Sequence, residues 1–444
     1  MKSNELITQD ITSLIKKIAI PSSVGLFFNT MYNVVDTFYV GTISTIAITA
    51  LSYSFMIYFL LLSISFGLSS AITAHVGNSL GRNKIFLAKI FVSQGISFVT
   101  LIAIFLVLLG TIFLEELFSL IGATDKALSL AIEYTQVIFI GVIPMLMGLG
   151  INAVLIAKGD TKSYRNTLVV GFFLNLILNP LFIYGYGVIP EFGFIGVAYA
   201  TVLIQICTFS YIFYKLSKTN LLLKKSIYFL PDFRMYKKLL FQALPMSLNM
   251  FMMSIGSMIL ISFVSSYGYK AVAAFGIGYR VEQIGLLPML GLNTAVASIV
   301  ANNYGAKKFD RIFEVRKKAL IYGYIMSFIG VIFLVVFGKY IIMVFDNDTE
   351  VIDIAYGYIV INSLIFFGYI TIFISNSTLQ GIKNPYIIPY ISLYRQIIMP
   401  MVLLTVFVNL FKVDIFFIWI VMLCIVYSAA IIIYVYSSKK LSRL

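Results

Sequence analysis

The segment IAIPSSVGLFFNTMYNVVDTFYVG, residues 18–41, is apolar except for one acid, Asp36, a few small polar side chains and a proline, Pro21. It forms most of an apolar run near residues 12–40, which exceeds the ~20 residues that a helix needs to cross a bilayer. This run predicts a membrane-spanning helix with a carboxylate at membrane depth.

Eleven further apolar runs follow the first one along the 444 residues. They lie near residues 46–74, 88–113, 130–157, 166–188, 194–215, 238–266, 271–301, 315–343, 352–379, 385–410 and 413–437. The predicted fold class is an all-α integral membrane protein with twelve transmembrane helices in two six-helix bundles. The predicted domains are an N-terminal lobe at 1–217, a basic linker at 218–237 and a C-terminal lobe at 238–444.

The composition supports a membrane protein and argues against a soluble one. Hydrophobic residues make up 60% of the chain and charged residues 11%, and the mean hydropathy is +0.99. A soluble domain has roughly 45–50% apolar and 25% charged residues. No cleaved leader is expected before the first helix. Cys207 and Cys424 fall in apolar runs, so they are expected to form no disulfide and no metal site. No cofactor is expected either.

The basic residues are divided unequally between the two sets of loops. Of the 32 lysines and arginines, 26 lie on the side that carries both termini, and four, namely Lys126, Lys270, Lys339 and Lys412, lie on the other side. Cytoplasmic loops retain positive charge, so both termini are predicted to be cytoplasmic, in a multi-pass protein of the cell membrane. The net charge of +14 then reflects topology, and no nucleic-acid partner is expected.

The two halves resemble each other. A shift of 224 residues aligns Pro21 with Pro245 and Gly81 with Gly305, at equivalent points of the two helix series. An even number of helices in each half gives both halves the same orientation in the membrane. The sequence therefore predicts a duplicated transporter-like architecture with a substrate site between the halves.

Ionisable residues at membrane depth are candidates for function because a charge is costly there. Asp36 shares a helix face with Asn29 and Asn33, and Asn175 and Asn179 repeat this pattern in the fifth run. A buried carboxylate among carboxamide and hydroxyl oxygens can hold a monovalent cation or a proton. The asparagines alone could simply form hydrogen bonds between helices. An unpaired acid at membrane depth costs too much free energy to be expected in a purely structural role.

Pro21 and three charged residues of the second half are further candidates. Pro21 leaves the carbonyl of residue 17 without its usual partner, which allows either a hinge or a static kink. Arg280, Glu282 and Arg395 are predicted to be a substrate contact or a structural pair, with Glu282 meeting Arg395 rather than Arg280. His75, the only histidine, is expected at a loop edge.

Several segments together resemble the multidrug and toxic compound extrusion (MATE) family over nearly the whole chain. They are the first helix with Pro21 and DTFYVG, the loop GNSLGRNK, the segment AKGDTKS, the helix LNLILNPLFIYGYG and the segment GFIGVAYAT. The resemblance implies two six-helix bundles that face each other as a V. It also implies that organic cations and drugs are exported by alternating access, driven by inward flow of Na⁺ or H⁺.

Carried over by position, the resemblance implies a cation site at Asp36 with Tyr32, Asn33, Asn175, Asn179 and Thr201 around it. The chain departs from some family members, which carry a second acid where Asn179 stands, and from the NorM-like branch, which has acids in the second lobe. Here Asp36 aligns with Leu260, which is more similar to the DinF-like branch. Aromatic, cationic small molecules are the expected substrates and a monomer is the expected state. A lipid-linked saccharide flippase of the same superfamily is the alternative.

Overall fold

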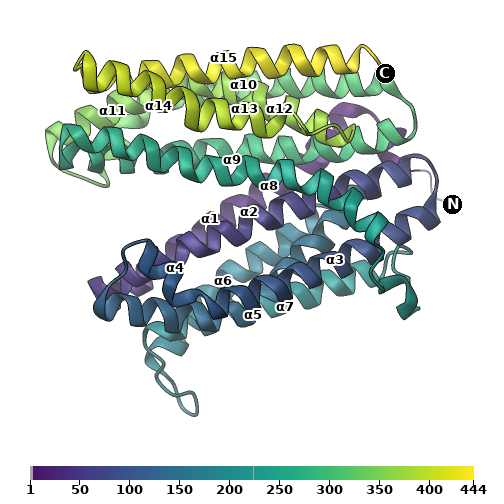
Figure 1. The fold of residues 1–444 in the computed structure, drawn as a ribbon, viewed down its shortest axis with the longest axis horizontal. Coiled ribbons are helices and arrows are strands. Elements are labelled where there is room, and N and C mark those ends of the chain that lie inside the picture. The colour runs from purple at the N-terminus through teal and green to yellow at the C-terminus, as the bar shows by residue number, and fades with distance from the viewer. Residues whose placement is uncertain (1–3, 224) are drawn as a thin grey trace. The chain divides into compact units, whose positions relative to one another are not determined.

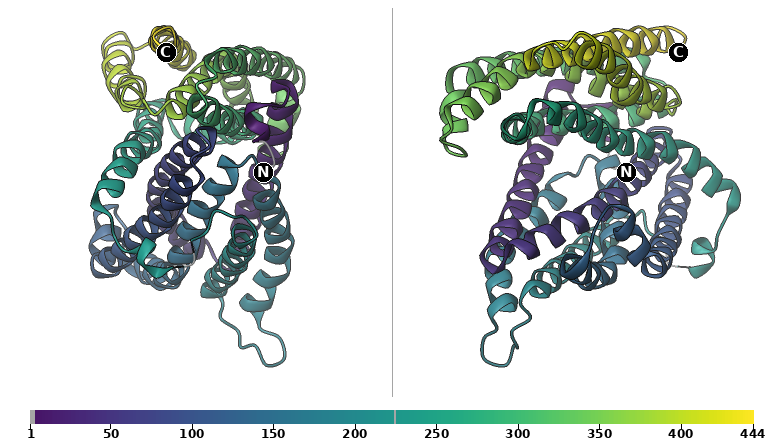
Figure 2. Two further views of the ribbon diagram at one scale, coloured as in Figure 1. Left: turned by 90° about the vertical axis from the view of Figure 1, so that its right-hand side faces the viewer. Right: turned by 60° about the vertical axis from the view of Figure 1, so that its left-hand side comes forward.

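The computed structural model describes residues 4–223 and 225–444, and these are almost entirely helical (Figure 1). Seven helices make up the first half of the chain. They are α1 (Ile11–Ile43), α2 (Thr45–Gly81), α3 (Ile85–Ile112), the short α4 (Leu114–Leu120), α5 (Asp125–Ala157), α6 (Lys162–Tyr184) and α7 (Phe194–Ser217). The connection between α6 and α7 reaches beyond the helix ends (Figure 2) and holds the nearly fully exposed Val188.

The second half repeats this order with two interruptions. Its helices are α8 (Phe233–Val264), α9 (Tyr269–Gly305), α10 (Phe309–Met343), α11 (Thr349–Ser363), α12 (Ile365–Gly381), α13 (Ile388–Leu393), α14 (Met399–Leu404) and α15 (Ile415–Leu441). α11 and α12 form one span bent by 45°, and π-helical turns join α13 to α14 and follow α14. Among the described residues, eleven helices and this bent pair are long and apolar enough to cross a membrane. The prediction of twelve spans is confirmed.

The helix boundaries support the duplication. α2 and α9 span Thr45–Gly81 and Tyr269–Gly305, so both ends differ by 224 residues. α5 spans Asp125–Ala157 and the α11–α12 pair spans Thr349–Gly381, with the same offset at both ends. An offset that is constant over more than a hundred residues is expected when one half is a copy of the other.

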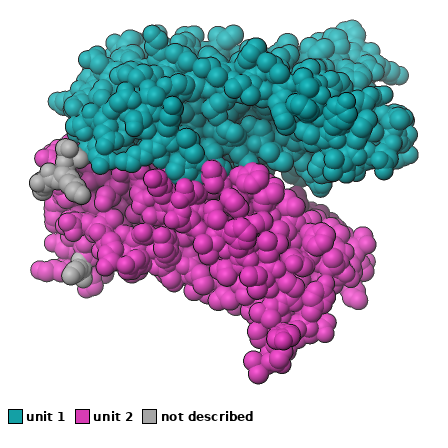
Figure 3. All heavy atoms as spheres, turned by 180° about the vertical axis from the view of Figure 1, so that it is seen from behind, with its two compact units in different colours: residues 1–23, 245–444 teal, residues 24–244 magenta. Residues whose placement is uncertain are grey.

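The described chain divides into two compact units, coloured in Figure 3. Unit 1 contains the residues up to Ser23 together with Pro245–Leu444, and unit 2 contains Val24–Leu244. Each border falls inside a helix, in α1 just after Pro21 and in α8 at Pro245. The units therefore exchange the first parts of α1 and α8, whereas the predicted lobes 1–217 and 238–444 follow the order of the chain.

In unit 2, α5 packs against α2, α3 and α7. The segment that leads into α8 is anchored on α3, because the Gln94 amide donates to the carbonyls of Tyr228 and Leu230, both at 2.8 Å. His75 is buried in α2, with its ring stacked on Phe91 at a centroid distance of 4.6 Å. The expectation of a loop-edge histidine is wrong because α2 continues to Gly81, past the predicted end of the helix.

In unit 1, the residues before α1 are held by α9 and α10. Asn4 Nδ2 donates to Asn302 Oδ1 at 2.9 Å, and Asn303 Nδ2 donates to the Leu6 carbonyl at 2.9 Å. Arg311 adds a bond of 2.6 Å to the Gln9 carbonyl. These contacts fix the start of α1 to unit 1, so α1 is anchored separately on either side of Pro21.

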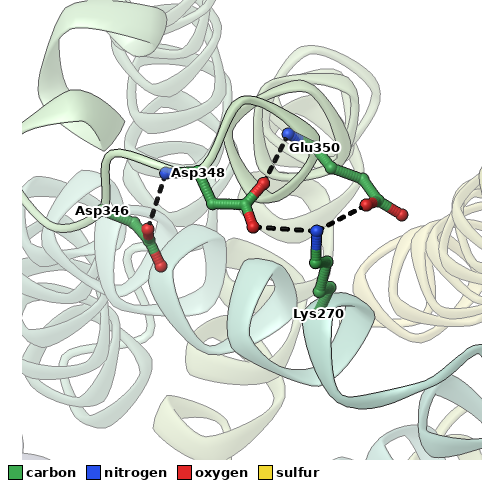
Figure 4. Close-up of polar contacts among 4 residues, drawn as sticks. All are labelled: Lys270, Asp346, Asp348 and Glu350. Atoms are coloured by element: carbon green, nitrogen blue, oxygen red, sulfur yellow. Dashed lines mark hydrogen bonds and ion pairs between the residues drawn. The ribbon is translucent and has the colours of Figure 1, made fainter.

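A cluster of charged residues joins the start of α9 to the start of α11 in unit 1 (Figure 4). Lys270 Nζ lies 2.8 Å from an Asp348 oxygen and 2.7 Å from a Glu350 oxygen. Asp348 also caps α11 by accepting from the Glu350 amide, and Asp346 accepts from the Asp348 amide. The hydrogen bond from Lys270 lowers the pKa of Asp348, so this contact persists at neutral pH and is lost only as the pH falls below the usual carboxyl range.

Candidate functional site

The candidate site lies in unit 2, where α1 presents Asp36 to the interior. Asp36 is 4% exposed although it lies within an apolar helix, two turns before its end at Ile43. Tyr32 and Asn33 precede it by one turn and fall on the same side of α1, because residues three and four apart are neighbours on a helix. The face of α1 that the sequence marks as polar therefore points into the protein.

α6 supplies the hydrogen-bond partners of this carboxylate. Asn175 Nδ2 donates to Asp36 Oδ1 at 2.7 Å, and Asn179 Nδ2 donates to the same oxygen at 2.8 Å. Both asparagines are fully buried, and their spacing of four residues places them one above the other on α6. The predicted association of these three residues is present in the structure.

A small cavity adjoins the carboxylate. Its lining includes Tyr32, Asn33, Asp36 and Thr201, and Tyr32 Oη donates to Thr201 Oγ1 at 3.1 Å. The cavity volume is about 30 Å³, which can hold one or two waters or a small ion but no drug-sized molecule. The structure thus brings the six predicted residues to one site of ionic dimensions.

Four polar residues of this cavity were missed from the sequence. Thr135 Oγ1 donates to Ser54 Oγ at 3.0 Å, and Tyr58 and Tyr134 line the same space. The two tyrosines could have been predicted from the internal repeat of the sequence. An offset of 224 residues places Tyr58 on Glu282, which is an acid singled out in the second half, and places Tyr134 on Tyr358.

The negative charge of Asp36 has no positive partner in the described part of the site. Among the described residues, Asp36 forms no ion pair, and the side-chain oxygens of Asn175 and Asn179 are buried without a hydrogen-bond partner. A buried, unpaired carboxylate is strongly disfavoured in a low-dielectric interior. A carboxylate beside two orphaned carboxamide oxygens matches the oxygen ligands that hard cations prefer, and a proton would remove the same charge.

Unit 1 contains a second buried acid with different partners. Tyr358 Oη and Asn362 Nδ2, both on α11, donate to Glu282 Oε2, the latter at 3.2 Å. Among the described residues Glu282 forms no salt bridge, so the predicted direct contact with Arg395 is absent, although the two charges still interact electrostatically. The bent α11–α12 span brings a tyrosine and an asparagine to Glu282, and these donate the hydrogen bonds that were expected from the arginine.

Arg395 lies on a π-helical turn, Tyr394–Ile398, and stacks on Tyr369 with its guanidinium carbon 5.2 Å from the ring centroid. The wide turn precedes Pro400, which lacks an N–H and whose ring would crowd the carbonyl four residues earlier in a regular helix. Arg395 is buried, whereas Arg280 is exposed on α9. The structure therefore does not gather the three predicted charged residues into one ion-paired group.

We expect Tyr358→Phe to destabilise unit 1. The substitution removes a hydrogen bond to a buried carboxylate, which leaves a charge less well solvated and costs about 1–3 kcal/mol. Thermal unfolding in detergent would report this as a lower midpoint. The matched control is Tyr356→Phe, which removes a bond to the Val335 carbonyl at an exposed position and should change the midpoint little. Equal midpoints for the two variants would contradict a structural role for the Tyr358–Glu282 contact.

The duplicated helical bundle with a buried acid is that of a polytopic membrane transporter, and not of an enzyme. The family model MatE matches residues 21–181 and 245–406, which gives one match in each half. The chain belongs to the MATE family.

Relatives and solved structures agree with this assignment. The chain is 30% identical to "Probable multidrug resistance protein YoeA" of Bacillus subtilis, over 72% of this chain and 71% of the relative. It is 26% identical to "FAD transporter" of Shewanella oneidensis, over 80% and 79%. A solved structure described as "Outward-facing conformation of a multidrug resistance MATE family transporter of the MOP superfamily" covers 100% of this chain with a TM-score of 0.92 and 23% identity, and supports the fold.

Proposed function

We propose that this protein exports small organic molecules in exchange for Na⁺ or H⁺, and that the coupling ion occupies Asp36. The observation that carries the proposal is the buried Asp36 carboxylate, which has two amide donors but no cationic partner among the described residues. The two orphaned amide oxygens support a site that changes its occupant during the transport cycle. A cavity of about 30 Å³ beside the carboxylate leaves room for that occupant.

The names of the relatives support the choice of substrates. YoeA and the Staphylococcus aureus protein MepA, which is 22% identical over 76% of this chain, are both described as multidrug proteins. Export of a flavin nucleotide is a second candidate, favoured by the relative named as an FAD transporter. The lipid-linked saccharide flippase and the DinF-like branch stay predictions from the sequence.

The unequal loop charges support a cell-membrane protein with both termini in the cytoplasm. In this orientation a cation that enters from outside reaches Asp36, and an organic molecule leaves in the opposite direction. A ligand shifts a conformational equilibrium only through its differential affinity for the two states. Asp36 must therefore bind the cation more tightly in one state than in the other. We expect the protein to act as a monomer.

The test of this function is export of ethidium from cells that express the protein, with Na⁺ and pH gradients imposed separately. Export that follows one gradient supports ion-coupled export and identifies the coupling ion. Ethidium retention equal to that of cells without the protein would contradict it. Movement of a lipid-linked saccharide across proteoliposome membranes with no ion gradient would instead favour the flippase alternative.

Pro21 is proposed as the hinge of α1. The border between the two units falls within three residues of it, and Pro245 stands at the corresponding border in α8. We expect Pro21→Ala to slow ethidium export about tenfold at unchanged expression, because the missing hydrogen bond at the hinge is restored. Pro144→Ala is the matched control, since Pro144 lies inside α5 and away from the borders. Equal export rates for Pro21→Ala and wild type would contradict the hinge.

A further inference from the structure

A second and much larger cavity lies in unit 2, between α6 and α7. Its volume is about 590 Å³, within the range of roughly 300–1,000 Å³ typical of pockets for drug-sized ligands. All the residues that line it belong to unit 2, with Val24 contributed by α1. This cavity is distinct from the ionic cavity at Asp36, which has no room for an organic molecule.

The two cavities share helix faces. On α6, Thr167 and Gly171 line the large cavity and stand two turns and one turn before Asn175, which binds Asp36. On α7, Ile204 and Thr208 lie on the face that begins with Thr201. Four residues, or about one turn, correspond to a rise of about 6 Å, so on α6 the face that lines the large cavity continues into the carboxylate site. Occupancy of one cavity can therefore affect the helices that form the other.

The lining of the large cavity is apolar along most of its length and positive at one end. Val169, Val170 and Leu174 provide apolar contacts, and Arg165 is the one charged residue among the lining side chains. The Arg165 guanidinium donates to Asn166 Oδ1 through Nε at 3.1 Å and Nη2 at 2.6 Å, which fixes its plane. Arg165 forms no ion pair with any described residue.

A fixed guanidinium without a counter-ion is suited to a carboxylate or phosphate, which can accept two of its hydrogen bonds. Tyr211 adds a flat aromatic wall and carries Lys215 Nζ 5.3 Å from its ring centroid, which increases the local positive charge. None of the described residues that line this cavity is an acid. A purely cationic ligand would gain nothing from these charges.

We infer that this cavity binds flat, apolar organic molecules that carry a carboxylate or phosphate, with the anionic group on Arg165. The ligand class therefore includes organic anions and zwitterions in addition to cations. The inference rests on the proposed function in one respect, namely that the bound molecule is an exported one.

Two cysteines make the site testable in the purified protein. Cys207 is exposed and lines the cavity, whereas Cys424 is exposed on α15 in unit 1. The variant Cys424→Ser leaves Cys207 as the sole thiol, and Cys207→Ser leaves Cys424 as the control. The rate of alkylation by a membrane-permeant maleimide is measured with rhodamine 110, which carries a carboxyl group, and with its methyl ester rhodamine 123.

We expect rhodamine 110 to slow alkylation of Cys207 and to leave Cys424 unaffected. The ester should protect Cys207 about tenfold less well, because it cannot form the charge-assisted bond with Arg165. In Arg165→Gln the acid and the ester should protect Cys207 equally well, and in Arg165→Lys part of the difference in protection should remain. The control variant Arg82→Gln should show the same difference in protection as wild type.

Equal protection by the acid and the ester in wild type would overturn the inference. Absence of any protection of Cys207 by the dyes, in protein that exports ethidium, would also overturn it. So would protection of Cys207 by phosphatidylglycerol that the dyes do not reverse, because the cavity would then be a lipid-binding site. If the difference between acid and ester depends on Arg165 but no ion gradient drives ethidium export, the binding site stands and the proposed function fails.

Discussion

Asp36→Asn is expected to abolish ion-driven export while leaving the protein folded. Asparagine keeps the shape of the side chain and can still accept the bonds from Asn175 and Asn179, so the local packing survives. It removes the negative charge that either cation must neutralise. Loss of a charged partner at a buried site is worth about 3–5 kcal/mol, which corresponds to a fall on the order of 100-fold or more in gradient-driven ethidium export.

Two controls make this result specific. Asp353→Asn changes an exposed acid that pairs with Lys339, and it should export as wild type does. Asp36→Glu retains the charge and should keep part of the activity. Size-exclusion profiles equal to that of wild type would show that the variants are folded. Undiminished gradient-driven export by Asp36→Asn would remove Asp36 from the coupling mechanism.

Asn175→Leu and Asn179→Leu are expected to have the second largest effect. Each substitution removes a hydrogen bond to a charged group, worth about 1.5–3 kcal/mol, and an oxygen that could bind the cation. The concentration of coupling ion that gives half-maximal export should therefore change by about 10- to 100-fold. Initial export rates measured over a series of ion concentrations would report this shift.

Combination with Asp36→Glu provides the decisive comparison. Residues that act through one ion should not be additive, so in the Asp36→Glu background, which keeps part of the activity, either asparagine substitution should cause a smaller further loss than it does in wild type. Asn152→Leu, a buried asparagine on α5, serves as the control and should leave the ion dependence unchanged. Fully additive losses would indicate that the asparagines act on the fold and not on the ion.

The sequence predicted which polar residues of the first half lie together, because polar residues are rare in its apolar helices. Asn33, Asp36, Asn175 and Asn179 repeat at helical spacing, and such a stripe can be stable only when it faces inward. Tyr58 and Tyr134 were missed because a tyrosine in an apolar helix is equally suited to the membrane interface. Only the helix that opposes them distinguishes these positions, and that information is tertiary.

The second half was predicted less well for similar reasons. The expected pairing of Glu282 with Arg395 rested on charge alone, whereas Tyr358 and Asn362 reach Glu282 from α11. The bend between Ser363 and Ile365 has no proline or glycine at the break, so the sequence carries no signal for it. The division of the structure into compact units inside α1 and α8 differs from the predicted lobes, which followed the order of the chain.

The most direct test of the coupling claim is to drive the ion with the organic substrate. Proteoliposomes that contain the purified protein are given an ethidium gradient alone, and the opposing movement of Na⁺ or H⁺ is recorded for wild type and Asp36→Asn. We predict that ethidium flow drives one of these ions in the opposite direction in wild type and drives neither in the variant. Ethidium flow without ion movement in wild type, or equal ion movement in both proteins, would contradict coupling at Asp36.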